Sequence, residues 1–340
     1  MTTLAQVSKH LGLSMATVSR ALNGYPEVNA KTKARVLAAA EELGYRPNSA
    51  AQRLANGKSK MVGIMLQSPD ELFCAPTFLQ ELSTISQHLG ESGYDLLINS
   101  SINGDSVQNL SNFVSKSSVD GMIIKAPKVN DERIQFLHKK GIPFVVHGHD
   151  MSDLEYAYYD IDNASVAEQA VAFLYQLGHT KISFINSDES LAFAHCRANA
   201  FTKKVNELGL DSELCEVFHC LPEVKAGREL AIELLQGNER PTAIICSNSK
   251  VAYGIYVAAK ELGLEIGSDL SVISHDDGIT HFETREFEPP LTVTCSPLTD
   301  SSKPIADAII NLISCGDSGS QQTVAPVDLI VRSSTGKPKI

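Results

Sequence analysis

The first 45 residues contain the pattern that most constrains the fold, because they predict three short amphipathic helices around one small core. Apolar residues recur at helical spacing over residues 4–11, and Gly12 ends that run. A second helix, capped by Ser14, is predicted over residues 15–22, and a third over residues 29–44. The tight turn between the first two helices is typical of a helix-turn-helix unit. The inward-facing residues are expected to be Leu4, Val7, Val18, Leu22, Val36, Leu37, Ala40 and Leu43.

Charge is distributed unevenly along the chain. The first 60 residues hold nine Lys and Arg and three Asp and Glu, which gives a net charge of about +6. The whole chain carries -11, so the rest of it carries about -17. A basic end on an acidic body is the asymmetry expected of a protein that contacts nucleic acid at one end only.

In a helix-turn-helix unit the second helix enters the major groove of DNA with its N-terminal residues against the base edges. Here Met15 and Ala16 offer apolar contacts, whereas Arg20 is able to form a bidentate pair with a guanine. The residues expected to contact phosphates are Thr17, Ser19, Asn23 and Lys33. The alternative is a helical hairpin whose basic face is merely solvated.

At this point the chain resembles the LacI/GalR family of transcriptional regulators. The resemblance rests on TLAQVSKHLGLSMATVSRALNG and on VNAKTKARVLAAAEELGYRPNSAAQRL, which follow one another in the family's order. It implies that residues 47–55 form a hinge helix only on operator DNA and that Leu54 wedges into the minor groove at the centre of a palindrome. Independently of the resemblance, a helix this short is not stable alone in water, and an apolar wedge bends DNA. The alternative is that Leu54 is a linker residue that covers nearby apolar surface.

The remaining residues predict an α/β body with two doubly wound lobes. From residue 61 onward, short continuous apolar strands alternate with helical segments, which is typical of parallel sheets covered on both faces. A second series of strands and helices begins near Asp162. The resemblance likewise implies a two-lobed body of the periplasmic-binding-protein type, with several chain crossings between the lobes.

The predicted domains follow from these patterns. They are a headpiece at 1–46, a hinge and linker at 47–59, and an effector-binding and dimerisation domain at 60–340, with one lobe at about 60–160 plus 292–322 and the other at 162–290 plus 323–340.

Ligands of open parallel sheets bind beyond the carboxyl ends of the strands, so candidate residues are those that follow strands. The resemblance implies that positions matching Arg197, Asn248 and Asp276 bind the effector. Carboxylates, an amide and a guanidinium suit a polyhydroxylated ligand, which predicts a mono- or oligosaccharide. The candidate effector-binding residues are Phe78, His149, Asp162, Phe193, Arg197, Asn248 and Asp276. For Phe78 and Phe193, simple packing of their helices onto a sheet remains open.

Several departures from the family's pattern leave the effector's identity open. His147-Gly148-His149 stands where an acidic residue is frequent, Ser249 replaces a frequent Asp, and Ser274 a usual Gly. A nucleobase or nucleoside effector, or dependence on a corepressor, therefore remains an alternative. The H-x-H pair also suggests a metal, but no third ligand follows at a fixed spacing, so no metal or other cofactor is expected.

Other protein classes fit the sequence less well. G-x-G-x-x-G, the P-loop and the G-x-S-x-G elbow do not occur, so we do not expect an enzyme. A transporter's solute-binding protein would need an export signal, and the chain has no apolar run that would span a membrane. Seven scattered cysteines indicate reduced thiols. We therefore expect a cytoplasmic homodimer that binds palindromic operator DNA and a small-molecule effector, with DNA and effector binding coupled.

Overall fold

The computed structural model forms two units, Met1–Ser59 and Lys60–Ile340. The described residues are 2–45, 58–66, 76–100, 106–117, 119–237, 239–276, 278, 282–316 and 321–339. The predicted hinge at 47–55, including Leu54, lies outside the described residues. We refer to the described part of the first unit as the headpiece and to the second unit as the body.

Three helices form the headpiece: α1 (Leu4–Leu11), α2 (Met15–Leu22) and α3 (Ala30–Glu42). Side chains cap all three N-termini, because Thr3, Ser14 and Asn29 each accept a hydrogen bond from a backbone N–H three residues later. Gly12 ends α1 in the left-handed conformation, which glycine adopts without steric cost. The predicted helix-turn-helix is therefore confirmed, with its two caps at Ser14 and Asn29.

The headpiece core is small and lies where the three helices meet. Its fully buried members include Val7, Val18 and Val36, and Leu4, Leu22 and Leu43 pack around them. The prediction that Leu37 faces inward is wrong, since this side chain is 55% exposed. The α-helical repeat explains the error: a neighbour of Val36 points about 100° away from it, whereas Ala39, Ala40 and Leu43 return to the core.

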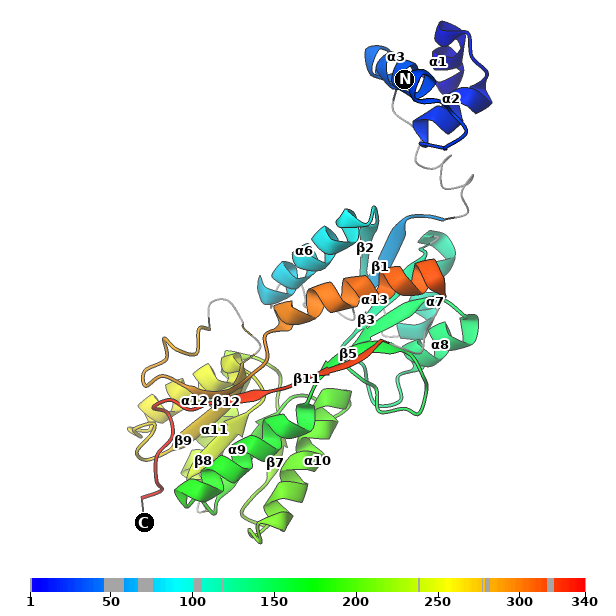
Figure 1. Ribbon diagram of the computed structural model, residues 1–340. Coiled ribbons are helices and arrows are strands. Elements are labelled where there is room, and N and C mark those ends of the chain that lie inside the picture. The colour runs from blue at the N-terminus through cyan, green and yellow to red at the C-terminus, as the bar shows by residue number, and fades with distance from the viewer. Residues whose placement is uncertain are drawn as a thin grey trace. The chain divides into compact units, whose positions relative to one another are not determined.

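The first lobe contains a parallel sheet in the order β11-β5-β4-β3-β1-β2. Its strands are β1 (Met61–Leu66), β2 (Asp95–Ser100), β3 (Gly121–Lys125), β4 (Phe144–His147), β5 (Ala157–Ile161) and β11 (Gln322–Ala325). Helices α6 (Pro76–Glu91) and α13 (Ser302–Cys315) cover one face, and α7 (Ser106–Ser117) and α8 (Glu132–Lys140) cover the other. Figure 1 shows α6 and α13 beside each other, although they are far apart in the sequence.

The second lobe contains a sheet in the order β12-β10-β9-β8-β6-β7, in which only the β10–β12 pair is antiparallel among the described strands. The strands are β6 (Ile182–Asn186), β7 (Val217–His219), β8 (Ala243–Cys246), β9 (Ser271–Asp276), β10 (Thr292–Cys295) and β12 (Asp328–Ile330). Helices α9 (Asn163–Leu177) and α10 (Ala192–Glu207) cover one face, and α11 (Val224–Gln236) and α12 (Ser249–Glu261) the other. Both sheets are buried on two faces, as the continuous apolar strands predict.

The described chain passes between the lobes at three places: after β5, after β10 and after β11. The predicted lobe boundaries need correction here. Residues 292–295 were expected in the first lobe, but β10 pairs with β9 and β12 of the second sheet. Conversely, β11 pairs with β5 of the first sheet, although residues 323–340 were expected in the second lobe. Thr292, Val293 and Thr294 are buried and β-branched, which suits an interior strand of either sheet, so tertiary packing decides which sheet the segment joins.

Candidate functional site

Helix α2 of the headpiece has one buried side and one solvent-facing side. Val18 and Ala21 are buried, whereas Met15, Ala16 and Arg20 are exposed, and Met15 is 54% exposed. The three residues predicted to face the base edges thus share the outward side of α2. An exposed methionine beside an arginine, held on a capped helix, has the composition of a base-reading surface. Their contact with bases remains a prediction.

The residues predicted to contact phosphates lie at the two ends of α2 and on α3. The Asn23 side-chain amide donates to the carbonyl of Ser19 at 2.9 Å, and the Lys33 ammonium donates to the carbonyl of Gly24 at 2.9 Å. The Thr17 and Ser14 hydroxyl oxygens lie 2.8 Å apart. These bonds fix the ends of α2, which is where phosphate contacts set the register of a protein on DNA.

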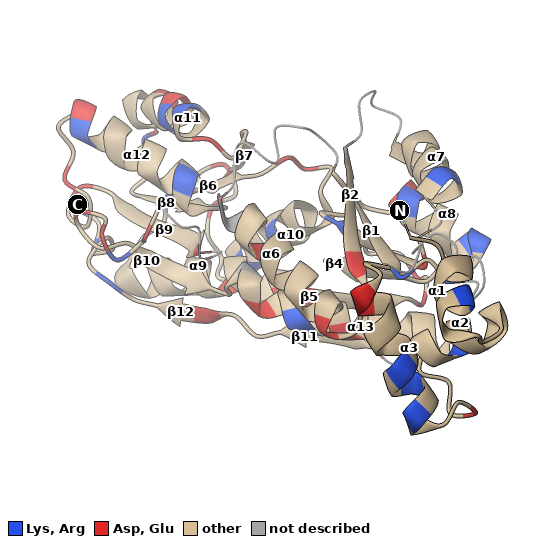
Figure 2. Cartoon of the chain, turned by 90° about the horizontal axis from the view of Figure 1, so that it is seen from above, with Lys and Arg blue, Asp and Glu red and all other residues tan. Residues whose placement is uncertain are grey.

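Basic and acidic side chains gather on different parts of the chain. Figure 2 shows Lys and Arg on the headpiece helices, notably α3, and Asp and Glu on body helices such as α6 and α13. On α3 the basic residues are Lys31, Lys33 and Arg35. This distribution is the electrostatic footprint of a protein that binds the DNA backbone through its headpiece.

A cavity of about 480 Å³ in the body is lined by residues from both lobes. Part of its lining comes from the carboxyl ends of strands, because Lys125 ends β3, His147 ends β4 and Ser247 follows β8. Two of the chain crossings supply a further part, through Asp160 and Asn163 on either side of one crossing and Ser296, Pro297 and Ser301 on another. The volume is in the range of small-molecule sites, and the position is the one expected for ligands of parallel sheets.

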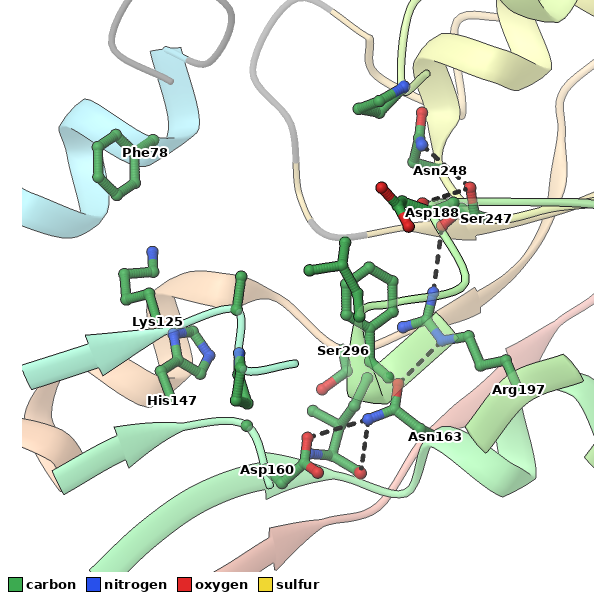
Figure 3. Close-up of a pocket in the computed structure, with 18 of the residues that line it drawn as sticks. Phe78, Lys125, His147, Asp160, Asn163, Asp188, Arg197, Ser247, Asn248 and Ser296 are labelled. Atoms are coloured by element: carbon green, nitrogen blue, oxygen red, sulfur yellow. Dashed lines mark hydrogen bonds between the residues drawn. The ribbon is translucent and has the colours of Figure 1, made fainter. Parts of the chain in front are cut away.

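A chain of hydrogen bonds runs through the cavity wall from Asp160 to Ser247 (Figure 3). The side-chain Nδ2 of Asn163 donates to Asp160 Oδ1 at 3.0 Å, and the side-chain Oδ1 of Asn163 accepts from Arg197 Nε at 2.9 Å. Arg197 also donates through Nη1 to the Ser247 carbonyl at 3.3 Å, and its guanidinium lies 5.0 Å from the centre of the Phe193 ring. Burial raises the pKa of Asp160. The network holds Arg197, which is only 4% exposed, in one orientation at the cavity.

The first lobe contributes a second polar group of side chains. Lys125 and His147 line the cavity and both bond to Glu81 of α6, which is fully buried behind them. The Lys125 ammonium lies 4.4 Å from the centre of the Phe78 ring, a cation–π arrangement. Phe78 therefore both packs in the core of the first lobe and lines the cavity.

The structure brings most of the predicted effector residues together. Those that line the described cavity are Phe78, His149, Phe193, Arg197 and Asn248. Asp162 and Asp276 are not among the described lining residues. The Asp162 carboxylate accepts from the backbone N–H and hydroxyl of Ser165 at 3.0 and 2.7 Å, and so caps α9. The Asp276 carboxylate accepts from the Gly278 N–H at 2.9 Å and the Thr284 hydroxyl at 2.6 Å. A carboxylate that follows a strand is thus also a natural cap for the next element.

Several lining residues were not singled out as ligand contacts from the sequence. They include Lys125, His147, Asp160, Asn163, Asp188 and Ser247. The rule that site residues follow strands would have found Lys125, Asp188 and Ser247, because each stands at or just after a strand that was predicted. Asp160 and Asn163 were missed because β5, the strand that leads to them, was not predicted.

The formal charges of the described lining residues balance. Lys125, Arg197 and Lys250 are cationic, and Asp160, Asp188 and Glu223 are anionic. Apolar side chains, including Leu191, Leu221 and Pro222, occupy the surface between them. A balanced set of charges interleaved with apolar surface suits a neutral ligand that carries many hydrogen-bonding groups.

Three further observations concern the described residues alone. They contain no group of three or more His, Cys, Asp or Glu arranged to hold a metal ion. The described cysteines are free thiols, and burial raises the pKa of Cys196, Cys215, Cys220 and Cys246. No described helix combines the length and apolar character that a membrane crossing requires.

Two family models match the chain, one for each unit. Residues 3–48 match "Bacterial regulatory proteins, lacI family", and residues 59–333 match "Periplasmic binding proteins and sugar binding domain of LacI family".

Individual proteins also match most of the chain. The HTH-type transcriptional regulator AglR of Rhizobium meliloti (strain 1021) is 37% identical over 334 residues, which cover 98% of this chain and 94% of that protein. The HTH-type transcriptional regulator RafR of Escherichia coli is 32% identical over 274 residues, which cover 80% and 81%. The crystal structure of the lac repressor dimer bound to operator and the anti-inducer ONPF superposes with a TM-score of 0.86 at 25% identity, covering 98% and 99%.

Proposed function

Because the chain belongs to the LacI family of bacterial transcriptional regulators, we propose that it represses carbohydrate-utilisation genes under the control of a neutral sugar bound between its two lobes. It is a DNA-binding regulator, and the family binds operator DNA and small-molecule effectors as dimers. The sugar, the homodimer and the direction of the response are the parts we propose.

The observation that supports the sugar assignment is the composition of the cavity wall. Its cationic and anionic residues balance in charge, and hydrogen-bond donors lie beside acceptors, as sugar hydroxyls require. Each sugar hydroxyl donates one hydrogen bond and accepts up to two, so it is best satisfied where an acceptor and a donor lie close together. The carboxylate of Asp160 is an acceptor, and the guanidinium of Arg197 is a donor in the same hydrogen-bonded network. Phe193, whose ring lies against Arg197, supplies an apolar surface for the faces of a pyranose ring.

The proposed mechanism couples this cavity to the DNA. Since both lobes line the cavity, a sugar that bonds to both changes their relative position, and it prefers one arrangement of the lobes over the other. In a homodimer this change alters the separation of the two headpieces on the half-sites of a palindrome. Sugar and operator affinities are then linked reciprocally, by about 1–3 kcal/mol. We propose that the sugar weakens operator binding, so the protein is an inducible repressor.

The test measures DNA binding and ligand binding in one system. A preferred palindrome is first selected from a random duplex pool with the full-length protein, and its affinity is followed by fluorescence anisotropy. Neutral mono- and disaccharides, nucleobases and nucleosides are then screened by thermal shift. We expect at least one neutral sugar to raise the melting temperature and to weaken operator binding.

The matched variants are two arginines of the second lobe. Arg197→Met should abolish the response to that sugar, because it removes the donor held by Asn163 at the cavity. Arg228→Met should leave the response unchanged, because Arg228 lies outside the described cavity and pairs with Glu261. If a nucleoside or nucleobase shifts the equilibrium and none of the sugars does, the sugar assignment is wrong while the regulator remains.

A further inference from the structure

Glu81 of α6 is a buried carboxylate that contacts two cavity residues without lining the cavity itself. Its side chain is 0% exposed, and its two oxygens have separate partners. Oε2 accepts from the Lys125 ammonium, and Oε1 accepts from Nδ1 of His147 at 2.9 Å. Burial alone raises the pKa of Glu81, but the charge of Lys125 and the hydrogen bonds from Lys125 and His147 outweigh burial and lower the pKa. Glu81 is therefore ionised.

This geometry decides which nitrogen of His147 carries a proton. An ionised carboxylate only accepts hydrogen bonds, so the Nδ1 atom that it contacts must be protonated. Nε2 has no hydrogen-bond partner among the described residues, and His147 lines the cavity. The Tyr159 ring packs against the imidazole in a T-shaped arrangement, with the two ring centroids 6.2 Å apart. In Figure 3 the His147 and Lys125 side chains lie together on the Phe78 side of the cavity.

We propose that Glu81 is a positioning residue for the effector. It holds His147 in the tautomer whose Nε2 accepts a hydrogen bond, next to the Lys125 ammonium, which donates one. His147 and Lys125 together then bind one sugar hydroxyl. This inference rests on the proposed sugar-binding function and names the part of the first lobe that takes part in it. A hydroxyl that donates to Nε2 and accepts from the ammonium satisfies both groups. Replacing that hydroxyl by hydrogen or by a methyl ether removes the donated bond.

The arrangement also gives Glu81 a role that an ordinary buried ion pair lacks. A structural pair would need only Lys125 and Glu81, since these two charges already compensate each other. The additional bond to His147 fixes the imidazole tautomer, which affects the cavity and not the core. Fixing a tautomer through the second ring nitrogen is how carboxylates orient histidines at functional sites.

The first experiment reads the tautomer without any ligand. The full-length protein is labelled with ¹⁵N-histidine, and the His147 signals are assigned with His147→Gln. At a pH about 1.5 units above the usual histidine pKa of about 6.5, we expect Nδ1 protonated and Nε2 unprotonated. Glu81→Gln should mix the tautomers, and Glu81→Asp should largely restore the Nδ1–H form. The same Nδ1–H tautomer in Glu81→Gln as in the wild-type protein would overturn the proposal.

The second experiment reads the consequence for binding by calorimetry. The probe is whichever of glucose, galactose, maltose, lactose, sucrose or melibiose binds the wild-type protein most tightly. Glu81→Gln should weaken it by about 10-fold, the effect of losing a hydrogen bond to or through a charged group. Glu91→Gln is the matched control, because Glu91 is an exposed glutamate on the same helix that also lies near a histidine, His88, at 3.5 Å. It should bind the probe with wild-type affinity.

A double-mutant cycle shows whether Glu81 acts through His147. If it does, Glu81→Gln should cost much less in the His147→Gln background than in the wild-type protein. Equal losses in both backgrounds would contradict the proposal. If none of the six sugars binds any variant, the sugar assignment fails, whereas the tautomer measurement still decides the role of Glu81. Circular dichroism of Glu81→Asp and His147→Gln shows whether each variant is folded.

Discussion

At the scale of single residues, His179 is a buried imidazole with both ring nitrogens engaged. Its Nδ1 lies 2.8 Å from the Thr242 hydroxyl oxygen, and its Nε2 lies 2.9 Å from the Gly336 carbonyl oxygen, to which it donates. Burial lowers the pKa of His179 below its usual value. The folded protein therefore disfavours a proton that the unfolded chain accepts at a pH below about 6.5.

The stability that His179 contributes as a neutral residue should be complete above pH 6.5, roughly the unfolded pKa, and should decline as the pH falls below that value. Urea unfolding of the wild-type protein at several pH values should show this decline. His179→Gln should flatten part of it, whereas His138→Gln, at an exposed position of α8, should not. If the free energy of unfolding depends on pH in the same way for the wild-type protein and for His179→Gln, His179 does not contribute to the decline.

Arg20 is the residue on which sequence readout is expected to depend. It is exposed on the outward side of α2, and it is the only long basic side chain among the predicted base contacts. Arg20→Ala should reduce discrimination between operator and scrambled DNA by about 1–3 kcal/mol. Lys31→Ala, an exposed basic residue of α3, should weaken both DNAs alike. Fluorescence anisotropy at a fixed salt concentration measures the affinity of each variant for operator and for scrambled DNA. If Arg20→Ala discriminates between the two DNAs as well as the wild-type protein does, Arg20 does not take part in base recognition.

At the scale of elements, α11 and α12 pack so closely that only glycine fits at their contact. A Cβ on Gly254 would lie 2.3 Å from the carbonyl oxygen of Val224 and 2.6 Å from the backbone nitrogen of Arg228. A Cβ on Gly227 would lie 2.7 Å from the carbonyl oxygen of Val251. Backbone atoms cannot move aside as a flexible side chain can, so the two helices would have to separate.

Gly254→Ala should therefore destabilise the body by about 1–3 kcal/mol, the usual cost of overpacking. Gly90→Ala in α6 is the matched control, because nothing lies within 4 Å of the Cβ it would add. That control should be neutral or should stabilise by up to about 1 kcal/mol through helix propensity. Melting temperatures of the two variants test the contact, and a Gly254→Ala protein as stable as wild type would contradict it.

Elements with strong local patterns were predictable, and those stabilised mainly by their neighbours were not. The short apolar runs at β1, β3 and β6 favour buried strands, and the capped helices α2 and α3 have clear ends. In contrast, β11 is largely exposed, and its four residues QTVA become a strand by pairing with β5. For the same reason the sequence misplaced the lobe boundaries, because strand partners are chosen by tertiary packing.

At the scale of the whole molecule, the charge asymmetry and the family assignment agree on a protein that binds DNA through its headpiece. The sequence predicted this organisation because the helix-turn-helix pattern is local. It predicted the cavity only in part. Arg197 and Asn248 could be found from their positions after strands, whereas Glu81 could not, because its role depends on contacts with β3 and β4 across the first lobe.

A substitution in the predicted hinge separates DNA bending from sugar binding. Leu54 is expected to wedge into the minor groove and to bend the operator, at a cost of a few kcal/mol that added contacts offset. Leu54→Ala should reduce the bend, measured by gel mobility of circularly permuted fragments, and should leave sugar affinity in the isolated protein unchanged. An unaltered bend in that variant would assign the bend to another residue.

The three passages of the chain between the lobes have a consequence for how such a protein diversifies. Neither lobe is encoded by one continuous stretch of gene, so a recombination event within the body would exchange fragments of both lobes and break their strand pairing. The headpiece, in contrast, joins the body through one covalent connection near Ser59. A crossover there would join an existing effector-binding body to a headpiece with a different DNA specificity in a single step.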